Sequence, residues 1–173
     1  MKELIIYHRT TISNLINRVH AYTDSFRDNE LELLGQGLYG TTTEEGQHRE
    51  PLRGYGDMIL KFSIEPTKIL CLDFEQFSQM PMATEFPTYD ESDFLAKQLQ
   101  LLGIPFDAAQ LAQHKGWALA SHLVNAQNDL RAKCTGLLYR DSETDDLWVI
   151  CFEPKKTSTA LSSKNDGGVE EIY

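Results

Sequence analysis

The sequence predicts an α+β fold, because the predicted strands gather near both ends of the chain and the predicted helices lie between them. Its 173 residues are the size of one ordinary domain. With 41% hydrophobic and 24% charged residues, the composition is typical of a globular protein with a buried core. We therefore expect a single domain over residues 1–161, followed by a flexible tail over residues 162–173 that is rich in Ser, Gly and charge.

Strands are predicted where short apolar or alternating runs stand between turn residues. The glycines around Leu38 and Tyr39 indicate a turn that leads into a short strand. The other expected strands, in chain order, lie at residues 4–7, 57–64, 68–72, 135–139, 147–152 and 157–161, the last at a sheet edge.

Helices are predicted where apolar residues recur at intervals of three and four. The segments that fit are residues 11–22, residues 93–102, and residues 107–130 with an interruption at Gly116. Residues 44–56 are polar and are expected to form a short helix or an irregular loop. Residues 80–89 contain two prolines and are expected to form a loop.

Charge, hydropathy and cysteine spacing argue against several classes of protein. Asp and Glu outnumber Lys and Arg by 26 to 16, for a net charge of -10, whereas a protein that grips duplex DNA through its phosphates needs a basic face. No apolar run approaches the roughly 20 residues that span a bilayer, and residues 1–8 lack the pattern of a signal peptide. The three cysteines are widely spaced in apolar stretches, which is typical of buried thiols in a reducing compartment. We therefore expect a cytoplasmic protein, or one delivered into a target cell without an N-terminal signal.

Three polar or aromatic segments stand out as a set. They are Tyr7-His8-Arg9-Thr10 at the end of the first predicted strand, Gly35-Gln36-Gly37-Leu38-Tyr39 with a second tyrosine at Tyr55, and the acidic turn over residues 141–146. Taken singly, these are typical of a strand end, a hairpin and a solvated turn. Together they resemble the ADP-ribosyltransferase fold, in the branch that includes diphtheria toxin and the poly(ADP-ribose) polymerases.

The resemblance implies split antiparallel β-sheets with flanking helices, and a site for NAD as co-substrate without a metal. In that branch the first strand ends in His-Gly-Thr or His-Gly-Ser, and a glutamate opens a late strand. The residues that would bind NAD here are His8, Arg9, Thr10, Gly37, Tyr39, Arg53 and Tyr55. The residues that would take part in catalysis are His8, Tyr39 and an acid, Asp146 or Glu143.

The residue types suit nicotinamide chemistry. Two tyrosines can sandwich a flat cationic ring through stacking and cation–π attraction. A carboxylate beneath the ribose stabilises the oxocarbenium-like centre that forms when the nicotinamide–ribose bond breaks. Arginines can hold the pyrophosphate, and the candidates are Arg9, Arg49 and Arg53.

Two positions depart from the pattern of the family. Arg9 replaces the glycine that follows the histidine, so its side chain would crowd or reshape the pocket. Asp146 stands where the family has glutamate and is one methylene shorter. Glu143, in the same turn, is the alternative acid, and Glu153 at the far end of the strand is a weaker candidate. Loss of the acid is known among inactive members of this fold.

The resemblance therefore predicts a monomeric mono-ADP-ribosyltransferase that transfers ADP-ribose from NAD to a macromolecule, in the manner of a bacterial or phage effector or toxin. The net charge of -10 favours a protein acceptor over nucleic acid. Two alternatives use the same pocket: an NAD glycohydrolase with water as the acceptor, and a catalytically degenerate member that binds NAD or a protein partner. If the three segments match by coincidence, the expectation is an α+β domain of another function.

Overall fold

The computed structural model has an α+β fold, as the sequence predicts, with helices packed beside a sheet of mostly antiparallel strands. It describes residues 3–10, 34, 37–49, 56, 58–64, 68–85, 91, 93–126, 129–152, 158–165 and 168–172. The strands are β1 (Leu4–Thr10), β2 (Leu38–Thr41), β3 (Met58–Ile64), β4 (Ile69–Cys71), β5 (Gly136–Arg140), β6 (Leu147–Cys151), β7 (Ser158–Asn165) and β8 (Gly168–Ile172). The helices are α3 (Glu44–Gln47), α4 (Phe74–Phe77), the 3-10 helix η4 (Pro81–Glu85), α5 (Phe94–Leu101), α6 (Ala108–Leu111), α7 (Gly116–Ala126) and α8 (Leu130–Lys133).

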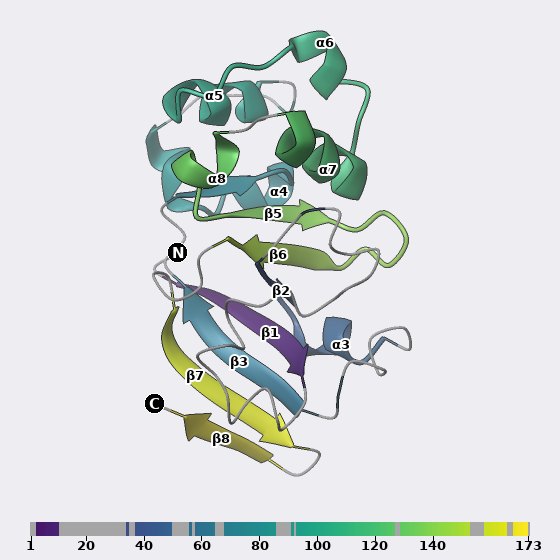
Figure 1. Ribbon diagram of the computed structural model, residues 1–173, viewed down its shortest axis with the longest axis vertical. Coiled ribbons are helices and arrows are strands. Elements are labelled where there is room, and N and C mark those ends of the chain that lie inside the picture. Colours follow the sequence, from purple (N-terminus) through teal and green to yellow (C-terminus); the bar gives the residue numbers. More distant parts are fainter. Residues whose placement is uncertain are drawn as a thin grey trace.

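The described strands form a sheet in the order β4-β5-β6-β2-β1-β3-β7-β8, in which β4 and β5 run parallel and the other neighbours antiparallel. Strand β1 pairs with β3 along its whole length, but it meets β2 at a single residue pair, Tyr7 opposite Thr41. In Figure 1, β1, β3, β7 and β8 form one curved group, whereas β4, β5 and β6 lie beside the helices. The sheet is therefore nearly divided at the junction of β1 and β2.

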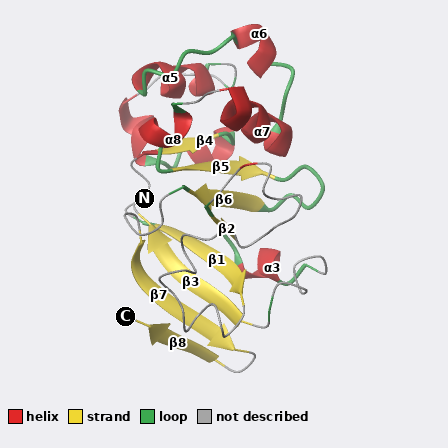
Figure 2. Cartoon of the chain, in the orientation of Figure 1, coloured by secondary structure: helices red, strands yellow, loops and turns green. Residues whose placement is uncertain are grey.

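The main core lies between the β4, β5 and β6 part of the sheet and the helices α5 to α8, which gather at that end of the molecule (Figure 2). Strands β5 and β6 are buried at nearly every position, as strands covered on both faces are. The apolar stripe that predicts α5 buries Phe94, Leu95 and Leu99 in this core. Burial of these side chains attaches the helical end to the sheet.

A side chain of α5 closes the edge of the sheet at β4. Gln98 is fully buried, and its Oε1 accepts a hydrogen bond from the Cys71 N–H at 2.9 Å. Its Nε2 donates to the Cys71 carbonyl oxygen at 2.8 Å. The side-chain amide thus takes the place of a neighbouring strand, and the buried peptide groups of Cys71 are satisfied.

Two regions between the strands differ from the prediction. The helix expected over residues 107–130 is interrupted at Gly116 as predicted, where the chain turns with a φ of +54° and α7 begins, and it is divided once more between α7 and α8. A Cβ atom at Gly116 would lie 2.6 Å from the Arg140 carbonyl oxygen, so both the φ and the close approach require glycine. The loop expected over residues 80–89 begins as the 3-10 helix η4, with Pro81 at the first position, where proline needs no hydrogen-bond partner.

The C-terminal region also differs from the prediction. The strand expected over residues 157–161 continues to Asn165 as β7, and it lies between β3 and β8 instead of at an edge. Within the segment expected as a tail, the second half of β7 pairs with β8. Pairing with the long strand β3 orders β7 through main-chain hydrogen bonds, which a polar composition does not prevent.

Most of the remaining expected elements are present. The strands predicted over residues 4–7, 57–64, 68–72, 135–139 and 147–152 and the helix over residues 93–102 are confirmed, with small changes at their ends. The polar segment from residue 44 begins with the short helix α3. The helix predicted over residues 11–22 lies outside the described residues.

Candidate functional site

A polar cluster lies where the end of β1, the short helix α3 and the start of β6 come together. We call it the α3 cluster, and its members are Arg9, Thr41, Gln47, His48, Arg49 and Asp146. Three of these residues, Arg9, Arg49 and Asp146, are candidate site residues from the sequence. Figure 1 shows α3 beside the C-terminal end of β1.

Arg9 ties β1 to α3. Its main-chain N–H donates to Gln47 Oε1 at 2.9 Å, and its side chain donates from Nε to the Gln47 carbonyl oxygen at 2.7 Å. Nη1 donates to the Gly56 carbonyl oxygen at 2.8 Å, and Nη2 lies 3.3 Å from His48 Nδ1. The residue is 8% exposed. Arg9, which stands where the resemblance implies glycine, therefore connects β1 to α3 by hydrogen bonds. Its buried side chain occupies space beside β1.

Gln47 links β1 to β2 at the point where the sheet is nearly divided. It is fully buried, and its Nε2 donates to Thr41 Oγ1 at 2.9 Å while its Oε1 accepts from Arg9. Thr41 Oγ1 in turn donates to the Thr43 carbonyl oxygen at 2.6 Å. This series of hydrogen bonds satisfies the buried side chains of Gln47 and Thr41 at the junction of β1 and β2.

His8 and Tyr39 lie in contact on the neighbouring strands β1 and β2. His8 Nδ1 is 2.5 Å from the Tyr39 carbonyl oxygen, and the two residues are 0% and 1% exposed. Because a carbonyl oxygen only accepts hydrogen bonds, Nδ1 carries the proton, and Nε2 is the acceptor atom of the neutral ring. The Tyr39 ring belongs to the hydrophobic core and offers no open face for stacking in this conformation.

Close packing of strands accounts for the glycines beside Leu38 and Tyr39. A Cβ atom at Gly37 would lie 2.6 Å from the Cys151 carbonyl oxygen on β6. A Cβ atom at Gly40 would overlap the Ile6 side chain on β1 and lie 2.6 Å from a main-chain oxygen of that strand. Strand β2 therefore fits between β6 and β1 because these two positions have no side chain.

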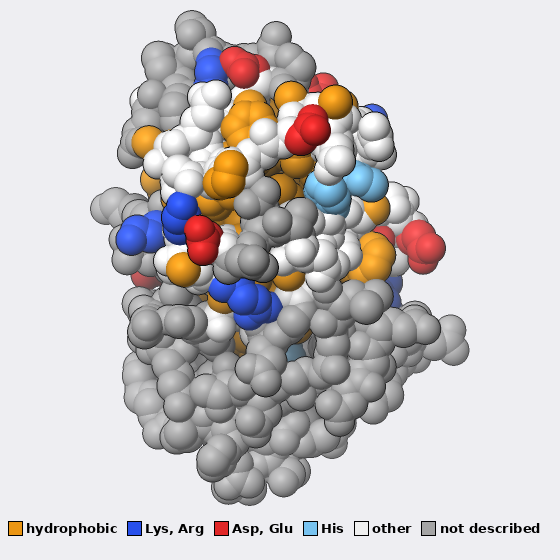
Figure 3. All heavy atoms as spheres, turned by 45° about the horizontal axis from the view of Figure 1, so that its top comes forward, with side chains coloured by type: hydrophobic (Ala, Val, Ile, Leu, Met, Phe, Trp, Pro, Cys, Tyr) orange, Lys and Arg blue, Asp and Glu red, His pale blue; other side chains and the backbone are white. Residues whose placement is uncertain are grey.

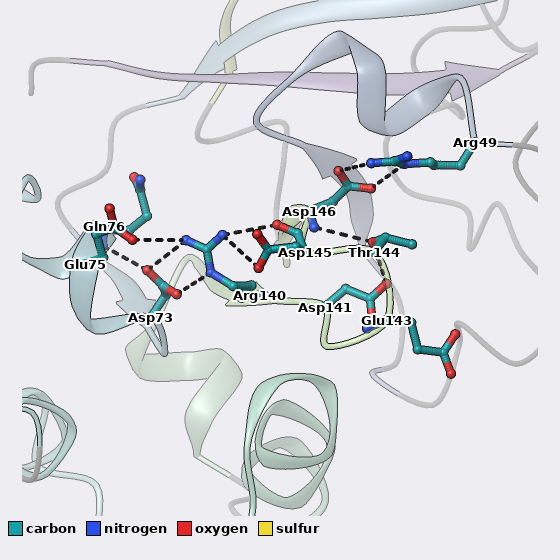
Figure 4. Close-up of polar contacts among 10 residues, drawn as sticks. All are labelled: Arg49, Asp73, Glu75, Gln76, Arg140, Asp141, Glu143, Thr144, Asp145 and Asp146. Atoms are coloured by element: carbon teal, nitrogen blue, oxygen red, sulfur yellow. Dashed lines mark hydrogen bonds and ion pairs between the residues drawn. The ribbon is translucent and has the colours of Figure 1, made fainter.

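Asp146, the acid favoured by the resemblance, forms a two-point ion pair with Arg49 (Figure 4). Nε lies 3.0 Å from Oδ2, and Nη2 lies 3.1 Å from Oδ1. The Asp146 side chain is 10% exposed, and that of Arg49 is 48% exposed. The hydrogen bond from Arg49 lowers the pKa of Asp146, because it stabilises the carboxylate, and raises the pKa of Arg49. Asp146 is thus held ionised and nearly enclosed.

The acidic turn before β6 is shaped by its own side chains. The Asp141 carboxylate accepts a hydrogen bond from the Glu143 N–H at 3.2 Å and one from Thr144 Oγ1 at 2.8 Å. Asp145 adopts the left-handed conformation with a φ of 62°, which aspartate tolerates better than most residues. Figure 4 shows the exposed Glu143 side chain pointing away from Asp146, so the two candidate acids do not converge.

A second ion-pair cluster lies on the other side of this turn. Arg140, the last residue of β5, lies 2.7 Å from Asp73, 3.3 Å from Asp145 and 3.7 Å from Glu75. Asp73 also caps α4 by accepting a hydrogen bond from the Gln76 N–H at 2.9 Å. The hydrogen bond with Asp73 raises the pKa of Arg140. The cluster connects the end of β5 to the start of α4.

The other predicted site residues are placed as follows. Thr10 is the last residue of β1 and lies opposite Met58, but its side chain is outside the described part of the structure. Arg53, Tyr55 and Glu153 lie wholly outside the described residues. The rings of His114 and His122 are stacked, with centroids 4.7 Å apart. Sequence reasoning missed Gln47, because a buried glutamine in a polar segment has no distinguishing pattern.

The described part of the chain was compared with the requirements of metal sites, reactive thiols and membrane spans. Among those residues, no group of three or more His, Cys, Asp or Glu side chains is placed to hold a metal ion. The three cysteines are free and buried, as predicted, and burial raises the pKa of each thiol to about 12. None of the helices in the described ranges has the length and apolar character needed to cross a membrane.

Comparison with known proteins leaves the family of the chain open. No family model and no curated protein sequence matches it. A solved structure described as "Crystal structure of an anti-CRISPR protein" aligns over 99% of this chain and 96% of its own, with a TM-score of 0.38 and 14% identity. A structural similarity this distant supports no conclusion about function.

Proposed function

We propose that this protein is a mono-ADP-ribosyltransferase, which transfers ADP-ribose from NAD to a protein acceptor. One observation carries the proposal: the strands β1, β2 and β6, which bear the three segments of the resemblance, are consecutive neighbours in the sheet. His8 and Tyr39 are in contact across β1 and β2, and Asp146 stands directly before β6. The near division of the sheet at β1 and β2 also agrees with the split sheets that the resemblance implies.

Asp146 has the role of stabilising bond cleavage in this proposal. Nicotinamide leaves C1′ of its ribose with the electron pair of the C–N bond, and the ribose becomes oxocarbenium-like. An ionised carboxylate beneath that centre lowers the energy of the cation, and Arg49 keeps Asp146 ionised. The acceptor nucleophile then bonds to C1′ and releases its proton to solvent. Water in the same role gives free ADP-ribose.

His8 has the role of orienting the dinucleotide. With Nδ1 bound to the Tyr39 carbonyl, Nε2 is the atom suited to accept a hydrogen bond from a ribose hydroxyl. Arg49 is the described arginine suited to a phosphate, because its side chain is half-exposed whereas Arg9 is committed to Gln47 and Gly56. Since His8 and Tyr39 are buried, binding of NAD requires local opening at the junction of β1 and β2.

A specific observation favours a second candidate, a catalytically degenerate protein that binds NAD or a protein partner. Arg9 fills the position at which the resemblance implies glycine, and both oxygens of Asp146 are engaged by Arg49. Catalysis requires Asp146 to exchange at least one of those contacts for the ribose, whereas binding alone does not.

Incubation with NAD labelled on the adenosine side tests these candidates. Release of nicotinamide with label retained on a protein of a cell extract supports the transferase, and release of free ADP-ribose supports the hydrolase. Saturable NAD binding without release of nicotinamide supports the degenerate protein. Absence of both binding and turnover would refute the proposed NAD site.

Matched variants in the acidic turn then test the role of Asp146. Asp146→Asn should lower the rate of nicotinamide release by roughly 100-fold while NAD still binds. Asp145→Asn, the same change at the next position, should keep the rate because its carboxylate is 84% exposed and pairs with Arg140. If Asp146→Asn keeps the rate and Glu143→Gln loses it, the acid is Glu143.

A further inference from the structure

A cavity of about 460 Å³ lies between α5, α6 and α7, beyond the ends of β4 and β5. Its volume is within the range of roughly 300–1,000 Å³ that small-molecule sites have. Figure 3 looks onto this end of the molecule, where hydrophobic side chains gather over the helices. No described residue of the proposed NAD site lines the cavity, so the two are separate features.

Aromatic side chains form much of the wall of the cavity. Phe94 belongs to the core and reaches the cavity from α5. Phe74 packs edge-on against Phe94, with ring centroids 5.4 Å apart, and Phe106 adds a third ring. Phe74, Phe106 and Leu111 pack against the core but stay partly exposed, so part of their apolar surface remains accessible. A ligand that covers this surface removes hydrocarbon from water on both partners.

The charged side chains of the lining balance one another. They are Asp73 and Glu91 against Lys115 and Arg140, with His114 counted as neutral. Arg140 Nε donates to Asp73 Oδ2 at 2.7 Å, so these two charges are already paired with each other (Figure 4). Glu91 and Lys115 are both exposed, and water weakens the attraction of an exposed charge for another ion. The lining therefore offers no net attraction to an ion of either sign.

We propose that this cavity binds a small uncharged molecule that carries an aromatic ring. The ring packs against Phe74, Phe94 and Phe106, because aromatic pairs in offset or edge-on contact gain attraction beyond the burial of area. A charged group on the same ring loses hydration as the ligand enters, and the balanced lining does not compensate for that loss. A hydroxyl group can stay at the mouth in contact with water. The proposal does not depend on the proposed NAD chemistry.

Four probes built on one two-ring skeleton test the class of ligand: 2-naphthalenemethanol, its saturated decahydro analogue, 2-naphthalenemethylamine and 2-naphthoate. Calorimetric titration of the full chain at neutral pH should give a saturable site for the aromatic alcohol. The protonated amine and the carboxylate should each bind about fivefold more weakly, and the saturated alcohol about threefold more weakly. Added sodium chloride should leave the affinity for the aromatic alcohol within about twofold, because salt screens only charges.

Variants on and beside α6 test the location. Ala108 and Ala109 are both exposed, but Ala108 lines the cavity and Ala109 does not. Ala108→Trp should place an indole ring in the cavity and weaken the aromatic alcohol about tenfold or more, whereas Ala109→Trp should leave its affinity within about twofold. Phe106→Leu keeps an apolar side chain but removes one ring, so it should weaken the aromatic alcohol about threefold and the saturated alcohol less.

The amide signals of the protein provide an independent measurement of location. Addition of the aromatic alcohol should shift the signal of Gly116, which lines the cavity, and leave that of Gly46 in α3 unchanged. Undiminished binding to a folded Ala108→Trp variant, or a shift at Gly46 but not at Gly116, would overturn the location.

The affinities of the four probes decide the class of ligand. Equal or tighter binding of the amine or the carboxylate would overturn the assignment to an uncharged molecule. Equal or tighter binding of the saturated alcohol, or an equal loss for both alcohols in Phe106→Leu, would overturn the aromatic contact. Failure of the aromatic alcohol to saturate any site up to its solubility limit would overturn the whole proposal.

Discussion

Gln98 holds the edge strand β4 against α5, and its replacement tests how the helical end is attached to the sheet. Gln98→Leu keeps the size and the burial of the side chain but removes both hydrogen bonds to Cys71, at 2.9 and 2.8 Å. Because Cys71 is fully buried, its N–H and carbonyl oxygen cannot turn to water instead. The substitution therefore leaves two unpaired main-chain groups in the core.

The magnitude follows from these two groups. Each buried polar group without a partner costs about 1–3 kcal/mol, and the added apolar surface of leucine offsets part of the total. We expect Gln98→Leu to lower the free energy of unfolding by about 2–5 kcal/mol. For a domain of this size, that loss corresponds to a decrease in Tm of roughly 5–15 °C.

Gln100→Leu is the matched control, because it makes the same change on the same helix at an exposed position. Its free energy of unfolding should stay within about 0.5 kcal/mol of the parent. Urea denaturation followed by circular dichroism measures both variants. Equal stability of the two variants would refute the argument that Gln98 closes the edge of β4.

Gln98→Glu adds a dependence on pH. In its protonated form the introduced carboxyl can donate to the Cys71 carbonyl as the amide does, but in its ionised form it cannot. Burial beside a carbonyl oxygen raises the pKa of the introduced group in the folded state. The variant should therefore approach the stability of the parent below the unfolded pKa of about 4.3 and lose stability as the pH rises. A stability difference that does not change with pH would contradict this explanation.

Three further predictions concern the strand junction, the ion pair and the thiols. Gly40→Ala should lower the free energy of unfolding by about 3 kcal/mol, because its Cβ would lie 2.6 Å from a main-chain oxygen of β1. Gly103→Ala, whose Cβ meets no atom closer than 3.7 Å but whose φ is +67°, should cost about 1 kcal/mol, and equal losses in urea denaturation would contradict the packing argument. Arg49→Gln should raise the pKa of Asp146, which carboxyl-carbon NMR measures. Because a lowered carboxyl pKa stabilises the fold above the unfolded value of about 3.9, the stability difference between this variant and the parent should disappear in acid. The three buried thiols, with pKa values raised to about 12, should react with Ellman's reagent no faster than the protein opens.

Elements that are defined by their own side-chain pattern could be predicted from the sequence. The alternation in β3 and the apolar stripe of α5 both arise from local burial, and both elements lie where predicted. Features that depend on a contact with a distant part of the chain could not be predicted. The glycine predicted the interruption at Gly116 but not its approach to the Arg140 carbonyl oxygen, and β7 extends past residue 161 because β3 offers main-chain partners.

Individual site residues could be predicted from the sequence, but the contacts between them could not be predicted. His8 and Tyr39 meet through a main-chain oxygen, which no side-chain pattern encodes. Gly37 was predicted to bind NAD, and the structure supplies a packing reason for the same glycine. Arg49 and Asp146 are 97 residues apart, so their pairing depends on how α3 is placed against the start of β6.

The short helix α3 connects the end of β1 with the start of β6. Arg9 holds its C-terminal end through Gln47 and His48, and Arg49 follows directly and engages Asp146. The free energy needed to break the side-chain contacts differs between Arg9 and Arg49. Withdrawal of the Arg9 side chain would leave the main-chain carbonyl of the buried Gln47 without its Nε donor, whereas Arg49 is half-exposed and can turn to solvent. A nucleotide that binds beside α3 can therefore displace Arg49 from Asp146, but it has to fit around Arg9.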